Sequence, residues 1–230
     1  MEKIRGIVLH IPHASPVLPF GRSGWDEGIE KEINRWTDWY TDWLFASLSM
    51  VDPRIVSITY PFSRFFCDAE RLENDPLEAI GQGRVYSRFG LLKRTLSKDE
   101  LAFALTSYRE HKERLVGALL RGGPRTLLVD CHSFPEDLSD VDVCIGVNDD
   151  WSRPEDTMLK RVLEHFQKMG YRTEINDPYS NSVSPDCGML YHSLMIEVNK
   201  RTYMRGETIL DLSRAALLRI TLDTMFLSLI

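Results

Sequence analysis

The chain has 230 residues, of which 43% are hydrophobic and 27% are charged, and its formal net charge is −6. This length and composition predict a single domain over residues 1–230 with a sizeable core. The absence of a basic stripe argues against nucleic acid as a partner. No apolar run approaches the roughly 20 residues of a membrane-spanning helix, and the first residues lack the apolar core of a signal peptide. We therefore predict a cytoplasmic protein without a membrane partner.

Short apolar runs alternate along the chain with longer segments in which apolar residues recur every three or four positions. In chain order we predict a strand at 6–11, a helix at 30–50 and a strand at 54–60. A helix from a capping box at 97–100 to about 120 precedes strands at 125–130 and 141–147. A second capping box at 152–155 opens a helix to about 169, before strands at 171–176 and 194–199 and a last helix at 207–229. The alternation predicts an α/β fold with a mostly parallel or mixed central sheet flanked by helices.

Polar side chains follow or end several of these strands. His13 follows the first strand, Arg64 the second and His132 the third, while Glu197 and Asn199 lie in the strand at 194–199. Because the carboxyl ends of parallel strands meet at one edge of a sheet, we expect these residues to converge there.

The two histidines at the strand ends suit a metal site. Catalytic zinc is held by three protein ligands, commonly imidazole and carboxylate, with a water molecule in the open position. His13 and His132 supply the imidazoles, and Asp38, which follows the first strand, is the predicted third ligand. Asp42 and Glu30 remain alternatives for the carboxylate. Several divalent metals accept this ligand set, so the cofactor is predicted to be Zn²⁺ or another divalent metal.

A carboxylate inside an apolar strand is costly to bury unless it has a partner or a role. We interpret Glu197 as the general base for the attacking water, the alternative being a structural ion pair with an arginine. His192 is predicted to stabilise the oxyanion. Cys131 is a competing nucleophile, although adjacent side chains in a strand point to opposite faces. His111 is expected to be solvated.

Five blocks of the sequence, IPHAS, WTDWYTDWL, FCDAERL, DCHSFP and HSLMIEVNKRTYM, together resemble the N-formylglutamate amidohydrolase family, in family order from about residue 7 to 205. The resemblance implies a phosphorylase/hydrolase-like fold related to the zinc carboxypeptidases. It implies hydrolysis of the N-acyl bond of an amino acid such as N-formylglutamate. It also implies that His13, Asp38 and His132 hold the metal and that Glu197 is the catalytic glutamate.

The chain departs from the family pattern where the substrate would bind. The family reads Asp-x-Asn-Arg at 68–71, where this chain has Glu70, and Glu-x-Asn-Arg at 197–200, where it has Lys200. The predicted substrate-binding residues are Arg64, Arg71, Asn199 and Arg201. Three functions therefore remain open: N-formylglutamate hydrolysis, a carboxypeptidase-like or other N-acyl amino acid deacylase activity, and non-catalytic binding of a small molecule on the same fold.

Overall fold

A six-stranded sheet forms the centre of the molecule, in a computed structural model that describes residues 3–230. Its strands are β1 (Gly6–Ile11), β2 (Ile55–Thr59), β5 (Thr126–Phe134), β6 (Val143–Gly146), β7 (Thr173–Ile175) and β8 (His192–Asn199). They lie in the order β2-β1-β5-β8-β6-β7, and only the β8–β6 pair is antiparallel within this described sheet. The predicted α/β class with a mixed, mostly parallel sheet is confirmed.

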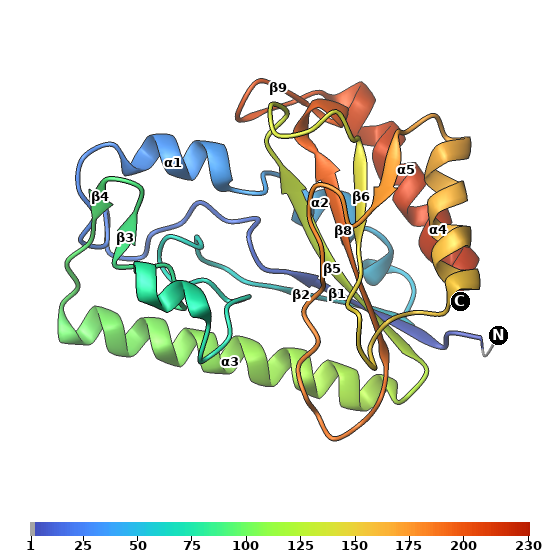
Figure 1. Cartoon of the computed structure of the whole chain (residues 1–230), viewed down its shortest axis with the longest axis horizontal. Helices are drawn as coiled ribbons and strands as arrows, with labels where there is room; N and C mark the ends of the chain where they lie inside the picture. The colour runs from blue at the N-terminus through green and yellow to red at the C-terminus, as the bar shows by residue number, and fades with distance from the viewer. Residues whose placement is uncertain (1–2) are drawn as a thin grey trace.

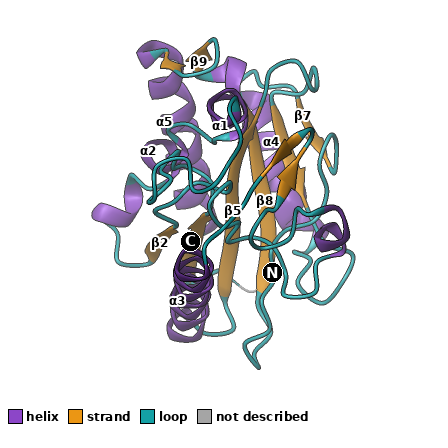
Figure 2. Ribbon diagram, turned by 90° about the vertical axis from the view of Figure 1, so that its left-hand side faces the viewer, coloured by secondary structure: helices purple, strands orange, loops and turns teal. Residues whose placement is uncertain are grey.

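Helices cover both faces of the sheet (Figures 1 and 2). They are α1 (Ile29–Trp36), α2 (Thr41–Phe45), α3 (Lys98–Gly122), α4 (Asp156–Lys168) and α5 (Leu212–Leu229). Leu115 and Leu119 of α3 pack on one face against Val8 and Leu128. Residues of α2, α4 and α5 form the larger core on the other face. No helix in the described part of the chain has both the length and the apolar character needed to cross a membrane.

Short elements complete the described chain. Two ribbons, β3 (Arg88–Phe89) with β4 (Leu92–Lys93) and β9 (Met204–Arg205) with β10 (Ile209–Leu210), lie outside the central sheet. Three 3₁₀ helices span Leu48–Met50, Pro76–Ile80 and Lys200–Thr202. Figure 1 shows α1, β3 and β4 beyond the carboxyl end of β1, where they extend the molecule past the sheet.

Strand β5 is longer than its sequence predicts. The apolar run ends at Asp130, but the strand continues to Phe134, and all nine of its residues are buried. Its pairing with β8 sets His132 opposite Glu197. Polar residues within a fully buried strand look like a strand end in sequence, so the predicted boundary is wrong by four residues.

The predicted helix at 30–50 is interrupted where it meets the sheet. Helix α1 ends at Trp36, and α2 begins at Thr41 after Tyr40, whose φ of 64° is left-handed. Within the break, the Asp38 amide donates a hydrogen bond to the His13 carbonyl at 2.9 Å. This contact brings Asp38 to the end of β1, an arrangement that an unbroken helix would not give.

Two other helix starts test the capping arguments. The capping box at the start of α3 is confirmed, with the Ser97 side chain accepting from the Glu100 amide and the Glu100 side chain from the Ser97 amide. The one predicted at 152–155 is wrong, because α4 starts at Asp156 without a side-chain cap and Ser152 instead donates to Asp150. Helix α5 starts at 212, five residues later than predicted, because β9 and β10 occupy the preceding segment.

Candidate active site

The two histidines predicted as ligands come together beyond β1 and in the last part of β5. Their ring centroids lie 5.1 Å apart, and both His13 and His132 are buried. His13 lies two residues beyond the end of β1, and the parallel pairing of β1 with β5 brings the two segments to the same edge of the sheet.

A buried carboxylate faces the Nε2 atom of each imidazole. Asp68 Oδ1 lies 2.8 Å from His13 Nε2, and Asp130 Oδ1 lies 3.1 Å from His132 Nε2. The hydroxyl of Tyr86 donates to the second oxygen of Asp68 at 2.6 Å. Carboxylates in this position fix the tautomer of metal-binding histidines, with the proton on the nitrogen that they contact. For His13 the lone pair is then on Nδ1, where the Arg64 guanidinium makes contact, whereas Nδ1 of His132 hydrogen-bonds the Asp38 carboxylate at 3.1 Å.

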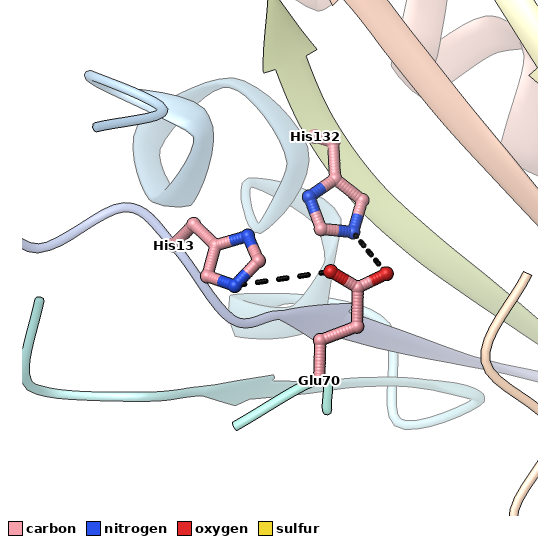
Figure 3. A group of neighbouring side chains, drawn as sticks. All are labelled: His13, Glu70 and His132. Carbon is pink, nitrogen blue, oxygen red and sulfur yellow. Dashed lines mark ion pairs between the residues drawn. The ribbon is translucent and has the colours of Figure 1, made fainter. Parts of the chain in front are cut away.

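Two further carboxylates approach the histidine pair from different sides. Asp38 Oδ2 lies 3.1 Å from His132 Nδ1 and 3.8 Å from His13 Nδ1. Glu70 approaches the other nitrogens, at 3.7 Å from His132 Nε2 and 3.8 Å from His13 Nε2. Figure 3 shows the Glu70 carboxylate pointing toward both rings. His13, Glu70 and His132 could hold a metal ion, and Asp38 offers an alternative carboxylate on the Nδ1 side of the same two histidines.

Burial and neighbouring charges shift the pKa values of these groups in opposite directions. Burial, together with the Arg64 guanidinium that contacts its ring, lowers the pKa of His13. Burial also disfavours the charged form of His132, but the carboxylates of Asp130 and Glu70 outweigh it and hold its pKa well above the usual value. Against the effect of burial, the hydrogen bond from His132 holds the pKa of Asp38 below its usual value. Ionised carboxylates around two imidazoles form a donor set that suits a divalent cation.

A cavity of about 280 Å³ lies beside His132. Glu197 lines it from β8, with 9% of its surface exposed and its Oε2 atom without a hydrogen-bond partner among residues 3–230. Burial raises the pKa of Glu197 to about 8. A carboxyl group with a pKa near neutrality at the wall of a cavity is suited to accept and release a proton.

Two of the predicted substrate-binding residues line the same cavity. Arg64 and Arg71 both border it, and the Nε atom of each is buried without a hydrogen bond in the described chain, although Nε of Arg71 lies 3.5 Å from the Asp68 carboxylate. A guanidinium group binds a carboxylate through two parallel hydrogen bonds. The cavity therefore combines a buried carboxyl group with two cations that could bind an anionic ligand.

The predicted oxyanion role of His192 does not agree with the structure. His192 opens β8 and pairs with Leu127, five residues before His132 in β5. At about 3.3 Å per residue, the histidine is roughly 16 Å along the strand from Glu197. It therefore lies toward the opposite edge of the sheet.

Asn199 and Arg201, predicted to bind substrate, are engaged in holding loops together. The Asn199 amide donates to the carbonyls of Ser139 and Val141. Arg201 donates to the Asp142 carboxylate at 3.0 Å. Neither residue lines the cavity beside His132. Asn199 ends a buried strand, and its side-chain amide satisfies loop carbonyls there. This structural role accounts for the residue without any contact to a substrate.

The alternative ligands and nucleophile also lie away from the site. Asp42 is exposed and accepts a hydrogen bond from the Trp43 amide, and Glu30 lies 3.3 Å from Arg22 in an exposed ion pair. Cys131 packs in the core on the other face of the sheet, where burial raises the pKa of its thiol well above the usual value. A deprotonated, accessible thiol is required of a nucleophile.

A line of buried polar side chains connects the histidine pair to α3. His10 Nδ1 lies 2.7 Å from Asp130 Oδ1, and His10 Nε2 lies 2.9 Å from His111 Nε2. All three side chains are buried. The prediction that His111 is solvated is wrong, because α3 turns this residue onto the sheet.

Comparison with known proteins identifies the family to which this chain belongs. Residues 5–204 match the model of the N-formylglutamate amidohydrolase family. The chain belongs to the N-formylglutamate amidohydrolase family. Its structure is similar to that of N-formylglutamate amidohydrolase from Ralstonia eutropha JMP134, with a TM-score of 0.77 and 20% identity over 98% of this chain and 94% of the other. A gene product from Agrobacterium tumefaciens is also similar in fold, with a TM-score of 0.66 and 15% identity over 99% and 92% of the two chains. A comparison with curated proteins gives no match.

Sequence reasoning missed the carboxylate of Glu70 as a candidate ligand of this family member. The block at 68–71 was noted as a departure from the family pattern, and the segment follows β2, which ends at the same edge of the sheet as β1 and β5. These two signals place Glu70 near the histidines, but the direction of a loop side chain is not encoded in a short motif.

Proposed function

We propose that this chain is a metal-dependent hydrolase that cleaves the N-acyl amide bond of an amino acid, with N-formylglutamate as the first substrate to test. The observation that carries the proposal is the position of Glu197. Its buried carboxyl group, whose Oε2 atom has no hydrogen-bond partner within residues 3–230, lies across from His132 and lines one cavity with Arg64 and Arg71. The family membership supports the bond type.

We assign His13, His132 and Asp38 as the metal ligands. The Nε2 atoms face the buried carboxylates of Asp68 and Asp130, and Asp38 is the carboxylate on the Nδ1 side. Glu70 is the alternative third ligand, through the Nε2 atoms. A bound divalent metal supplies a water molecule of lowered pKa as the nucleophile.

The side chains of the chain supply the remaining steps. Glu197 accepts the proton of the attacking water and then passes it to the nitrogen of the leaving amino acid. Arg64 and Arg71 bind the carboxylate of the amino acid and hold the amide beside Glu197. The products are the free amino acid and the carboxylate of the acyl group.

The proposal is tested by metal analysis together with hydrolysis of N-formylglutamate. We expect the purified protein to hold about one divalent metal per chain, to lose activity in a chelator and to regain it with Zn²⁺. His132→Ala should lose both metal and turnover, whereas Glu197→Gln should keep the metal and lose turnover by at least about a hundredfold. Unchanged turnover in Glu197→Gln would refute the role of this residue as general base. Activity that persists in a chelator would refute the metal requirement.

A further inference from the structure

A second, larger cavity adjoins the candidate active site. It has a volume of about 800 Å³ and is bordered by the loop after β2, by α3 and by the segment at 180–185. Arg71 lines both cavities, and Glu70, which approaches both imidazoles, lines the larger one. The two cavities therefore meet at Arg71, beside the carboxylate of Glu70 that faces the histidines, and one ligand molecule could extend from one into the other.

Helix α3 places a cation, Lys112, in the wall of the larger cavity. Its side chain is half-buried, and its ammonium group lies 5.5 Å from the centroid of the Tyr108 ring. Desolvation lowers the pKa of Lys112. Within residues 3–230 no carboxylate lies within ion-pair distance of Lys112, and the charges of Asp130, Glu70 and Asp68 act on it only from further away, although removing an ammonium group from water without a direct anionic partner is costly.

The carboxylates around this cavity are engaged elsewhere or exposed. Glu73 lies 3.4 Å from the Arg84 guanidinium, and Asp75 accepts a hydrogen bond from the Leu77 amide at 2.9 Å. Glu113, which also lines the cavity, is exposed on α3. Glu70 is directed toward the imidazoles (Figure 3). An anionic group of a ligand would supply the partner that Lys112 lacks.

The positions of the other groups decide which part of a substrate reaches Lys112. Under the proposed function, Arg64 and Arg71 bind the amino acid and Glu197 serves the leaving nitrogen, all within the smaller cavity. The acyl arm then passes the histidines into the larger cavity. A formyl group carries only a hydrogen beyond its carbonyl carbon and would leave that cavity unfilled.

We propose that the larger cavity is an acyl subsite, and that Lys112 selects acyl arms that end in a carboxylate. The substrate class is an N-acyl amino acid whose acyl group derives from a short dicarboxylic acid. Hydrolysis adds water across the amide and releases the free dicarboxylate and the amino acid, so no co-reactant is needed. This assignment rests on the proposed function.

The test compares two acyl arms of equal length, one charged and one neutral. N-Glutaryl-L-glutamate should be hydrolysed with a kcat/KM about tenfold higher than N-pentanoyl-L-glutamate. Lys112→Met should remove this preference by raising KM for the glutaryl compound, with little change for the pentanoyl compound. Lys160→Met, on the exposed face of α4, is the matched control and should change neither value. Equal kcat/KM for the two compounds, or an equal loss for both in Lys112→Met, would overturn the acyl subsite.

A binding measurement separates this inference from the proposed function. Glutarate is titrated calorimetrically into the wild-type protein and into Lys112→Met, both kept metal-free and both shown to be folded by circular dichroism. Binding about tenfold weaker in the variant supports the subsite, even when no N-acyl compound is hydrolysed. Equal binding to the two proteins, or none to the wild type, refutes the subsite even when N-formylglutamate is hydrolysed.

Discussion

Glu197 offers a test of the site that does not depend on knowing the substrate. Burial raises its pKa from the ordinary 4.5 to about 8, so between these values the folded protein holds a proton that the unfolded chain has released. The free energy of unfolding therefore falls as pH rises through this interval, by about 1.4 kcal/mol for each pH unit. The whole interval corresponds to about 5 kcal/mol, a large part of the stability of a typical domain.

Glu197→Gln removes the ionisable group and should remove this pH dependence. In metal-free protein, we expect the variant to gain stability relative to wild type as pH rises from 5 to 9, by about 4 kcal/mol. Any loss of packing or hydrogen bonding caused by the amide is the same at every pH, so the slope is the informative quantity. Urea unfolding followed by circular dichroism at pH 5, 7 and 9 measures it.

An exposed glutamate serves as the control. Glu174→Gln, on the exposed part of β7, should follow the wild-type pH profile. Parallel profiles for wild type and Glu197→Gln would show that the Glu197 carboxyl is not destabilised by burial, and the argument for it as a proton acceptor near neutral pH would fail. Adding Zn²⁺ should reduce the difference in pH dependence of stability between wild type and Glu197→Gln, because a nearby cation favours the ionised carboxylate.

Three further results are expected. Asp38→Asn should weaken Zn²⁺ affinity by about a hundredfold or more, and Glu70→Gln should weaken it less. Competition with a chelating dye measures both affinities. A larger loss of affinity in Glu70→Gln than in Asp38→Asn would make Glu70 the third ligand. Tyr86→Phe removes the hydroxyl that donates to Asp68 and should weaken metal binding by about tenfold in the same assay, unchanged affinity being the contrary result. Leu115→Ala should lower the free energy of unfolding, measured in urea, by about 2–5 kcal/mol, because this side chain packs between α3 and the sheet. Its metal affinity should stay unchanged, and loss of the metal would contradict a purely structural role for Leu115.

The sheet and the histidine pair could be predicted because both follow from short-range patterns. Apolar runs gave the six strands of the sheet, and the parallel order of β1 and β5 brought His13 to His132. Asp38 was predicted to lie near His13 because it follows the first strand, but this is only part of the reason. It reaches the site through a break in the helix, where the amide of Asp38 bonds the His13 carbonyl.

The residues that sequence reasoning misplaced are those whose role depends on register or on loop direction. His192 and Glu197 lie in one strand, and only the pairing with β5 shows that Glu197, and not His192, lies across from His132. Arg201 follows a buried strand, where a substrate-binding residue is expected, yet its guanidinium pairs with the neighbouring carboxylate of Asp142. Partners at long range in sequence cannot be read from a motif.

Asp130, which contacts His132, also links the sheet to α3 through His10. Backbone pairing sets His10 opposite Asp130, so β1 and β5 align the donor and acceptor before any ligand is considered. His111 then completes the line from α3 at 2.9 Å. Because the Asp130 carboxylate contacts both His10 and His132, a displacement of α3 that moved His111 and His10 would also change the surroundings of His132. Because α3 also carries Lys112, the helix that supports the histidine is the one that shapes the larger cavity.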